Sequence, residues 1–126
     1  MNPDGTPTGK YIPIKEIVSY RELLKHNSIN CSSVLLARNI AAEFPMEDDD
    51  SHEDYLTWLK ILRKYGPAVG INRPLLKYRM SKGSKSGNKK KSAVMTYKVY
   101  RYMGYNHLQC SLFFISYAIH GFWKYR

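Results

Sequence analysis

Two adjacent carboxylates stand at the start of a clear amphipathic helix pattern. Glu53 and Asp54 come directly before Tyr55, Trp58 and further apolar residues at helical spacing. A helix N-terminus favours negative charge, and a carboxylate held there can act as a general base that takes a proton from a hydroxyl group. The same residues can also serve the helix itself, because Ser51 followed by Asp54 is typical of an N-terminal cap. Spacing alone favours the capping role.

A second stretch contains residues that bind phosphate. Arg79 precedes residues 81–86, a run of Ser, Lys and Gly. Arg offers a forked donor, Lys a point charge, and Gly lets backbone amides approach an anion. The stretch can therefore cradle a diphosphate. A solvated basic loop explains the same composition equally well.

An acidic triplet, Asp48, Asp49 and Asp50, resembles a binding site for a hard cation. We favour a solvated acidic loop, because no further ligand follows at a useful spacing. The four histidines have neither metal-site spacing nor cysteine neighbours. The sequence therefore predicts no metal ligand among these residues.

The net charge of +10 is divided unevenly along the chain. All ten Asp and Glu residues lie between Asp4 and Asp54, whereas residues 55–126 carry fifteen Lys and Arg and no acid. Such a basic half indicates an anionic partner, which can be a phosphate group, nucleic acid or an anionic membrane face. An alternative function therefore stays open, namely a small basic binding module for nucleic acid or an anionic membrane surface.

Length and cysteine content indicate one intracellular domain. The 126 residues, 44% of them apolar, suffice for one modest core. No secretory signal pattern follows Met1, because Asp4 and Glu16 interrupt a short apolar run. Two cysteines make no disulfide framework, so we interpret Cys31 and Cys110 as small buried hydrophobes in a reducing, cytoplasmic compartment.

The elements that must position these residues are helices and short strands. A turn is expected over residues 1–10. Ser19 and Glu22 form a capping-box pattern, and Gly66 and Gly104 follow predicted helices. The predicted helices cover residues 19–26, 39–43, 52–64, 89–102 and 107–124. The predicted strands cover residues 32–37, 68–71 and 75–79.

The last predicted helix has an apolar stripe that recurs at steps of four and three residues. Its members are Leu108, Leu112, Ile115, Ile119 and Phe122, and Phe113, Phe114 and Tyr117 are expected to widen it. Polar residues interrupt the apolar sequence, so the helix is too short in continuous apolar sequence to span a bilayer. It can lie on a membrane or pack on the domain.

Four stretches, in this order, resemble the C-terminal half of bacterial family 2 glycosyltransferases that build cell-surface polysaccharides. They are residues 4–13, 27–36, 51–61 and 75–86, the last continued by residues 88–89 and 97–101. The resemblance implies an α/β fold: the C-terminal portion of a GT-A mixed sheet with flanking helices and two C-terminal helices. It implies that residues 1–126 form a single partial domain, the acceptor-side half, in which residues 88–126 are a helical extension.

The resemblance also implies roles for individual residues. The position of Asp54 is the family's general base, and Glu53 is the neighbouring acid that shapes the acceptor site. Trp58 belongs to the same motif and is assigned to substrate binding. Substrate binding is likewise assigned to Arg79, Ser84 and Ser86, which match the segment that closes over the donor diphosphate. Where some relatives have a metal-binding histidine two residues after the arginine, this chain has Ser81, which removes that ligand.

The implied activity is hexosyltransferase-type transfer, with inversion, from a nucleotide sugar to a saccharide or lipid-linked acceptor. The family's nucleotide-binding half, with its Asp-x-Asp metal motif, lies upstream of the matched region, and a divalent ion (Mg²⁺ or Mn²⁺) is expected in the complete enzyme. We therefore expect this chain to be inactive alone. Missing strands would leave an exposed sheet edge and promote self-association. The resemblance favours a peripheral site on the cytoplasmic face of the inner membrane and disfavours nucleic acid as the partner.

Overall fold

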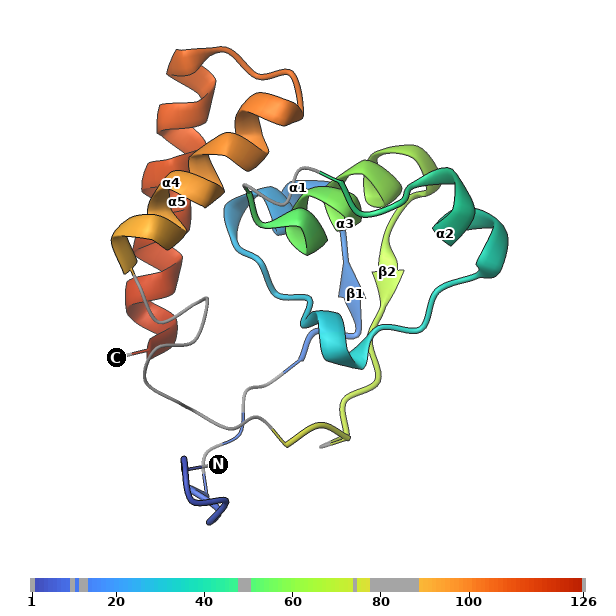
Figure 1. The fold of residues 1–126 in the computed structure, drawn as a ribbon, viewed down its shortest axis with the longest axis vertical. Helices are drawn as coiled ribbons and strands as arrows, with labels where there is room; N and C mark the ends of the chain where they lie inside the picture. The colour runs from blue at the N-terminus through green and yellow to red at the C-terminus, as the bar shows by residue number, and fades with distance from the viewer. Residues whose placement is uncertain are drawn as a thin grey trace.

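The computed structural model describes residues 2–9, 11, 14–47, 51–73, 75–77 and 89–125, with the side chains of the last segment described over residues 90–119. These residues form a mixed α/β structure of five helices, one 3-10 turn and a two-stranded sheet. In Figure 1, helices α4 and α5 lie together at one side, α1 and α3 lie next to them, and the strand pair and α2 lie beyond. The mixed class predicted from the sequence is confirmed at this level.

Helices α1 (Tyr20–Lys25) and α3 (Glu53–Tyr65) form from local signals. Ser19 caps α1, because its Oγ accepts a hydrogen bond from the Glu22 amide at 3.2 Å. Helix α3 has acids in its first turn, bases in its last, and ends at Gly66, where φ is 94°. A left-handed φ of this kind is the conformation that glycine adopts at no steric cost.

Helices α4 (Lys89–Tyr102) and α5 (His107–Tyr125) form a hairpin. The turn between them is held by a reciprocal pair of bonds: the Gln109 amide donates to Asn106 Oδ1 at 2.8 Å, and the Asn106 amide donates to Gln109 Oε1 at 3.3 Å. This capping pair, which sequence reading overlooked, satisfies free amides at the start of α5. Among the described helices, none combines the length and apolar content that crossing a membrane requires.

The sheet consists of β1 (Ile17–Val18) and β2 (Ala68–Val69), which pair antiparallel in the register Ile17 with Val69 and Val18 with Ala68. Val18 is buried in the core and Ile17 is exposed. Gly70 follows β2, and its amide donates to the Glu16 carbonyl at 2.7 Å. A side chain on Gly70 would collide with the Lys15 carbonyl, so glycine is required at this crossing.

One core joins α3 to α1, α4 and α5. It centres on α3, which buries seven residues from Tyr55 to Leu62. The other elements contribute Val18, Leu23, Leu24, Val99, Tyr100, Met103 and Cys110. Helix α2 (Arg38–Glu43) has no fully buried residue but packs Ile40 against this core. It is also tied to α3, because Glu43 accepts hydrogen bonds from Lys64 and Tyr65.

The strand predicted over residues 32–37 is wrong. The structure has a 3-10 turn, η1 (Cys31–Ser33), followed by extended chain outside any sheet, and Leu35 is fully exposed. The Ser32 amide donates to Asn30 Oδ1 at 3.0 Å, and Ser33 Oγ donates to the Asn30 carbonyl at 3.0 Å. These local side-chain bonds compete with strand pairing, and within the described residues β1 and β2 pair only with each other.

Three further predictions from the sequence differ from the structure, wholly or in part. Ser51 is not the α3 cap: His52 occupies that position without a side-chain cap bond, and Ser51 is fully buried. The strand predicted over residues 75–79 is absent at residues 75–77, and the remainder lies outside the described residues. The expected turn near the N-terminus is present over residues 2–6, and no strand follows it in the described part of residues 4–13.

Candidate active site

The carboxylates of Glu53 and Asp54 lie on the first turn of α3 and are half-buried. Asp54 Oδ1 accepts a hydrogen bond from the Tyr55 amide at 2.8 Å. That amide belongs to the helix's first turn, so Asp54 satisfies one of the free N–H groups there. A carboxylate has two oxygens, and this bond engages one of them, which leaves acceptor capacity for a substrate hydroxyl.

Tyr55 anchors the first turn of α3, which carries Glu53 and Asp54, to the core. Its side chain is fully buried, and its hydroxyl donates to the Leu23 carbonyl at 2.5 Å, with the Leu24 carbonyl at 3.2 Å. Both carbonyls belong to the last turn of α1, where helix carbonyls lack intrahelical partners. The position of Asp54 is therefore fixed by its buried neighbour.

His52 ties the start of α3 to the first turn of α4. Its Nε2 lies 3.0 Å from Ser92 Oγ and 3.2 Å from the Ser92 carbonyl oxygen. The contact joins two segments whose proximity was not predicted from the sequence. One carries the acidic pair Glu53 and Asp54, and the other is the helix that follows the basic stretch.

Cys31 lies near the acidic pair. Desolvation, and then the negative charges of Asp54 and Glu53, raise the pKa of the Cys31 thiol. The residue is exposed, so the prediction that it is a buried hydrophobe is wrong, whereas Cys110 is buried as predicted. Nothing in the local sequence marks Cys31 as a neighbour of Asp54, because their proximity depends on how η1 packs. The resemblance of residues 27–36 to an acceptor-side segment was the one available signal.

Trp58 faces the core one turn after Asp54. Its side chain is 6% exposed, and within the described residues its indole Nε1 has no hydrogen-bond partner. A buried N–H without a partner costs free energy, so this donor is available to a group that the described part of the chain does not supply. The assignment of Trp58 to substrate binding stays a prediction.

Arg79, Ser84 and Ser86 lie outside the described residues, as do Asp48, Asp49 and Asp50. What the structure does describe is the helix that follows the basic stretch. Helix α4 begins at Lys89, and Ser92, on its first turn, contacts His52. Ser86 is six residues along the chain from that contact.

The described residues do not fit a resident metal ion. Among them, no three His, Cys, Asp or Glu side chains gather in a way that could hold one. The thiol of Cys31, whose pKa the charges of Asp54 and Glu53 help to raise, is a soft donor, whereas Mg²⁺ and Mn²⁺ prefer oxygen. No catalytic step is therefore assigned to a metal held by this part of the chain.

Comparison with known proteins identifies the class. Four curated proteins that match the chain are all named as glycosyltransferases, and each match covers more than nine-tenths of the chain. The chain is thus a homologue of glycosyltransferases, as the sequence resemblance indicated. It spans about half the length of these curated relatives, which is consistent with a C-terminal half.

Two relatives show the degree of similarity. A Bacillus subtilis (strain 168) protein named for teichuronic acid biosynthesis, TuaG, is 35% identical over 119 residues, which cover 94% of this chain and 47% of the relative. An Escherichia coli protein named UDP-Glc:alpha-D-GlcNAc-diphosphoundecaprenol beta-1,3-glucosyltransferase WfaP is 37% identical over an alignment 127 residues long, gaps included, which covers 96% of this chain and 47% of the relative. No family model matches the chain, and no solved structure matches it significantly. Family 2 membership and the GT-A fold therefore remain predictions.

Proposed function

We propose that this chain is the acceptor-side half of an inverting, family 2 glycosyltransferase of GT-A fold, and that Asp54 is its general base. The observation that supports this best is the placement of Asp54. It is half-buried on the first turn of α3, beside a fully buried Tyr55, and its helix is bound through His52 to the start of α4. A rigid, partly desolvated carboxylate next to the helix that follows a basic stretch suits transfer from an anionic donor.

The proposed step is a single displacement. Asp54 takes the proton from an acceptor hydroxyl while the hydroxyl oxygen forms a bond to the anomeric carbon of the donor sugar. The bond from that carbon to the diphosphate oxygen breaks on the opposite face, and the diphosphate leaves with the electron pair. The configuration at the anomeric carbon is thereby inverted. A positioned general base of this kind contributes about 10²–10⁴-fold to the rate.

Other residues would support this step. Glu53 would shape the acceptor site beside Asp54. The Trp58 indole, which has no hydrogen-bond partner among the residues that the structure describes, would contribute to substrate binding. Arg79, Ser84 and Ser86 would hold the diphosphate as it leaves, because Arg forms paired hydrogen bonds to phosphate oxygens. A divalent ion would neutralise part of the diphosphate charge. Residues outside the part of the chain that the structure describes would hold this ion.

The printed names of two relatives support a proposal for the substrates. Two Escherichia coli relatives, WfaP and WfgD, are named for transfer from UDP-Glc to GlcNAc-diphosphoundecaprenol. We infer that this chain serves a nucleotide-sugar donor of hexose type and a saccharide or lipid-linked acceptor in cell-surface polysaccharide synthesis. Such an acceptor would place the working enzyme at the cytoplasmic face of a membrane.

A chimera tests the proposal. The part of WfaP that this chain does not cover is joined to the chain, and UDP release from UDP-Glc is measured with GlcNAc-diphosphoundecaprenol as acceptor. Asp54→Asn is expected to lower kcat by at least about 10²-fold while the KM for the donor changes little, because the amide cannot take the proton. Asp4→Asn, at an exposed carboxylate of the N-terminal turn, is the matched control.

Two outcomes would count against the proposal. Full activity of Asp54→Asn would remove Asp54 as the base. A folded chimera that transfers no sugar would favour the alternative, a basic binding module, whose affinity for an anionic partner falls steeply with salt. We also expect the 126-residue chain alone to release no UDP from UDP-Glc, and turnover by it would show that it needs no second half.

A further inference from the structure

Helix α5 has two apolar faces on opposite sides. One face packs against the core through Cys110, Phe113, Phe114 and Tyr117. The other carries Leu108, Leu112, Ile115 and Ile119, which are 71%, 60%, 56% and 52% exposed. We call these four residues the outer stripe. The expectation that Phe113, Phe114 and Tyr117 widen this stripe is wrong, because they lie on the face toward the core.

The outer stripe is continuous along the helix. Its members follow one another at steps of four, three and four residues, which places them on one side at about 100° per residue. From Leu108 to Ile119 the stripe runs about 16 Å, at roughly 1.5 Å per residue. The side chain of Phe122, the fifth member expected from the sequence, lies outside the described residues.

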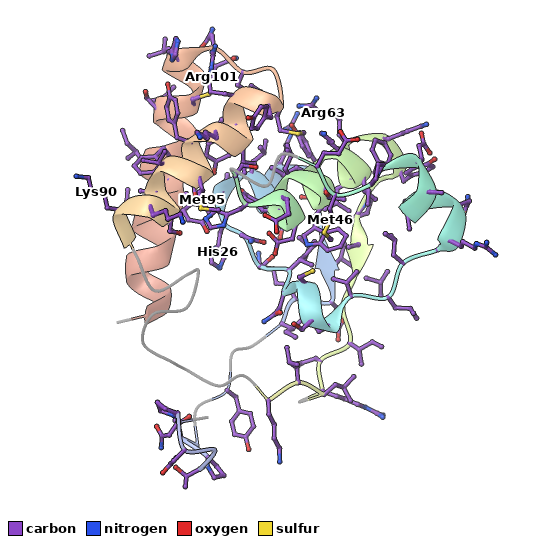
Figure 2. The ribbon with its side chains drawn as sticks, viewed as in Figure 1. His26, Met46, Arg63, Lys90, Met95 and Arg101 are labelled. Atoms are coloured by element: carbon purple, nitrogen blue, oxygen red, sulfur yellow. The ribbon has the colours of Figure 1, made fainter. Side chains whose placement is uncertain are left out.

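The charge of the segment that contains α4 and α5 indicates which kind of surface can cover the stripe. Helices α4 and α5 belong to the part of the chain that contains fifteen Lys and Arg and no acid. Lys90 and Lys91 are exposed on the first turn of α4, the helix that pairs with α5. Figure 2 shows Lys90 pointing away from the folded body. An apolar stripe on a helix whose hairpin partner carries exposed lysines and no acid is complementary to an anionic lipid surface, which offers both phosphate groups and hydrocarbon.

A second copy of the chain fits the stripe less well. Association through α5 would bring two strongly basic regions together, and like charges repel. Four half-exposed aliphatic side chains also present only on the order of 400 Å² of apolar surface. Stable protein interfaces bury about 800 Å² on each partner. The stripe is therefore small for a dimer, whereas a few aliphatic side chains suffice to enter a headgroup layer when basic residues assist.

We propose that the outer stripe of α5 docks into the surface of an anionic lipid bilayer, with the lysines at the start of α4 at the level of the phosphate groups. The opposite face of α5 keeps its contacts with the core, so docking does not require the fold to open. This proposal stands on the surface of α5 and is independent of the proposed transfer activity.

The test is flotation of the 126-residue chain with two kinds of vesicle, phosphatidylcholine alone and phosphatidylcholine mixed with phosphatidylglycerol. Binding is expected with the anionic vesicles and to be much weaker with the zwitterionic ones. The double substitution Leu112→Gln with Ile115→Gln is expected to lower the bound fraction by at least about tenfold, because both side chains would otherwise enter the bilayer. Leu35→Gln is the matched control, because Leu35 is a fully exposed aliphatic residue outside the stripe.

Each other outcome overturns the proposal. If the chain floats with neither kind of vesicle, the stripe has no affinity for lipid. If the double variant keeps its circular dichroism spectrum and floats as the unmodified chain does, the positive charge alone accounts for binding. If the unmodified chain sediments as a dimer that the double variant converts to a monomer, without lipid binding, the stripe is an interface between copies.

Discussion

The Tyr100 hydroxyl donates a hydrogen bond to the Leu24 carbonyl oxygen at 2.7 Å, across 76 positions of the sequence. Leu24 lies in the last turn of α1, where the carbonyl has no partner within the helix. Tyr100 on α4 and Tyr55 on α3 both direct their hydroxyls to this turn. Two buried tyrosines from different helices therefore complete the C-terminus of α1.

Tyr100→Phe removes this bond while the ring still fills the core. Among the described residues, the Leu24 carbonyl would then keep the Tyr55 hydroxyl, at 3.2 Å, as its donor. A buried acceptor that loses its best donor costs about 1–3 kcal/mol, so we expect the free energy of unfolding to fall by about that amount. Urea denaturation followed by circular dichroism measures it. Tyr11→Phe, at an exposed tyrosine, is expected to change little, and an equal effect of both would contradict the role of the bond.

Arg63 joins α3 to α1 and to the turn after α4. Its Nη2 donates to the Tyr20 hydroxyl at 2.8 Å and to the Met103 carbonyl at 3.0 Å. The guanidinium also lies over the rings of Tyr20 and Tyr105, at 5.3 Å and 5.8 Å from their centroids. In Figure 2, Arg63 extends from α3 toward the hairpin of α4 and α5.

Arg63→Lys keeps the charge and loses the fork that reaches two acceptors at once. We expect a loss of about 1–2 kcal/mol in the free energy of unfolding, from one or two hydrogen bonds and part of the cation–π contact. Thermal unfolding of the variant measures this loss. Arg38→Lys, at an exposed arginine on α2, should leave the midpoint unchanged. If Arg63→Lys behaves in the same way, the hydrogen bonds of the guanidinium do not contribute measurably to holding the three elements together.

Local sequence signals predicted the helices well. Ser19 starts α1, Gly66 ends α3, and both signals work within a few residues of the chain. For the segment over residues 32–37, local signals gave the wrong prediction. Its branched apolar residues suit a strand, but a strand needs a hydrogen-bonded neighbour, and Asn30 offers the backbone a closer partner.

The faces of α5 and the surroundings of Asp54 depend on tertiary packing. Periodicity showed that Leu112 and Ile115 share one side of the helix, but it does not tell which apolar side meets the core. Likewise, the acidic pair was correctly placed on the first turn of α3, while the approach of Cys31 and of Ser92 was not predicted. Contacts between residues far apart in sequence leave no spacing signal.

Buried tyrosine hydroxyls predict a loss of stability at high pH. Burial, and then the hydrogen bond to Tyr105, raise the pKa of Tyr20 from 10.0 to about 12, and Arg63 opposes this shift. Burial also raises the pKa of Tyr55 and of Tyr100 above the ordinary value. The folded state holds these protons more tightly, so the stabilisation is complete below pH 10 and is lost as the pH rises through about 12.

Denaturant titrations just below pH 10 and near pH 12 measure this loss, and absorbance of tyrosinate reports ionisation. We expect the buried tyrosines to ionise together with unfolding. Tyr20→Phe should shrink the difference between the two pH values, because one linked group is removed. Tyr11→Phe should not. Independent ionisation of all eleven tyrosines near pH 10, without unfolding, would contradict this burial.

The two cysteines provide a probe of the acidic pair. Cys31 is exposed and Cys110 is buried, so we expect a thiol reagent to label one cysteine in the folded chain and two after denaturation. The charges of Asp54 and Glu53 contribute to raising the pKa of the Cys31 thiol, and the thiolate is the reactive form. Removing one of these charges lowers that pKa, which increases the thiolate fraction at neutral pH.

Asp54→Asn should therefore speed the labelling of Cys31, on the order of twofold for charges partly screened by solvent. Glu22→Gln removes one charge from α1 and is the matched control, because Glu22 makes no contribution to the pKa of the Cys31 thiol. Stopped-flow labelling of the native chain, with Cys110 replaced by Ala, gives the two rates. If Asp54→Asn and Glu22→Gln change the rate equally, Cys31 does not sense the acidic pair, and η1 does not pack beside the first turn of α3. A faster rate for Asp54→Asn alone would place Cys31 at this site independently of any activity assay.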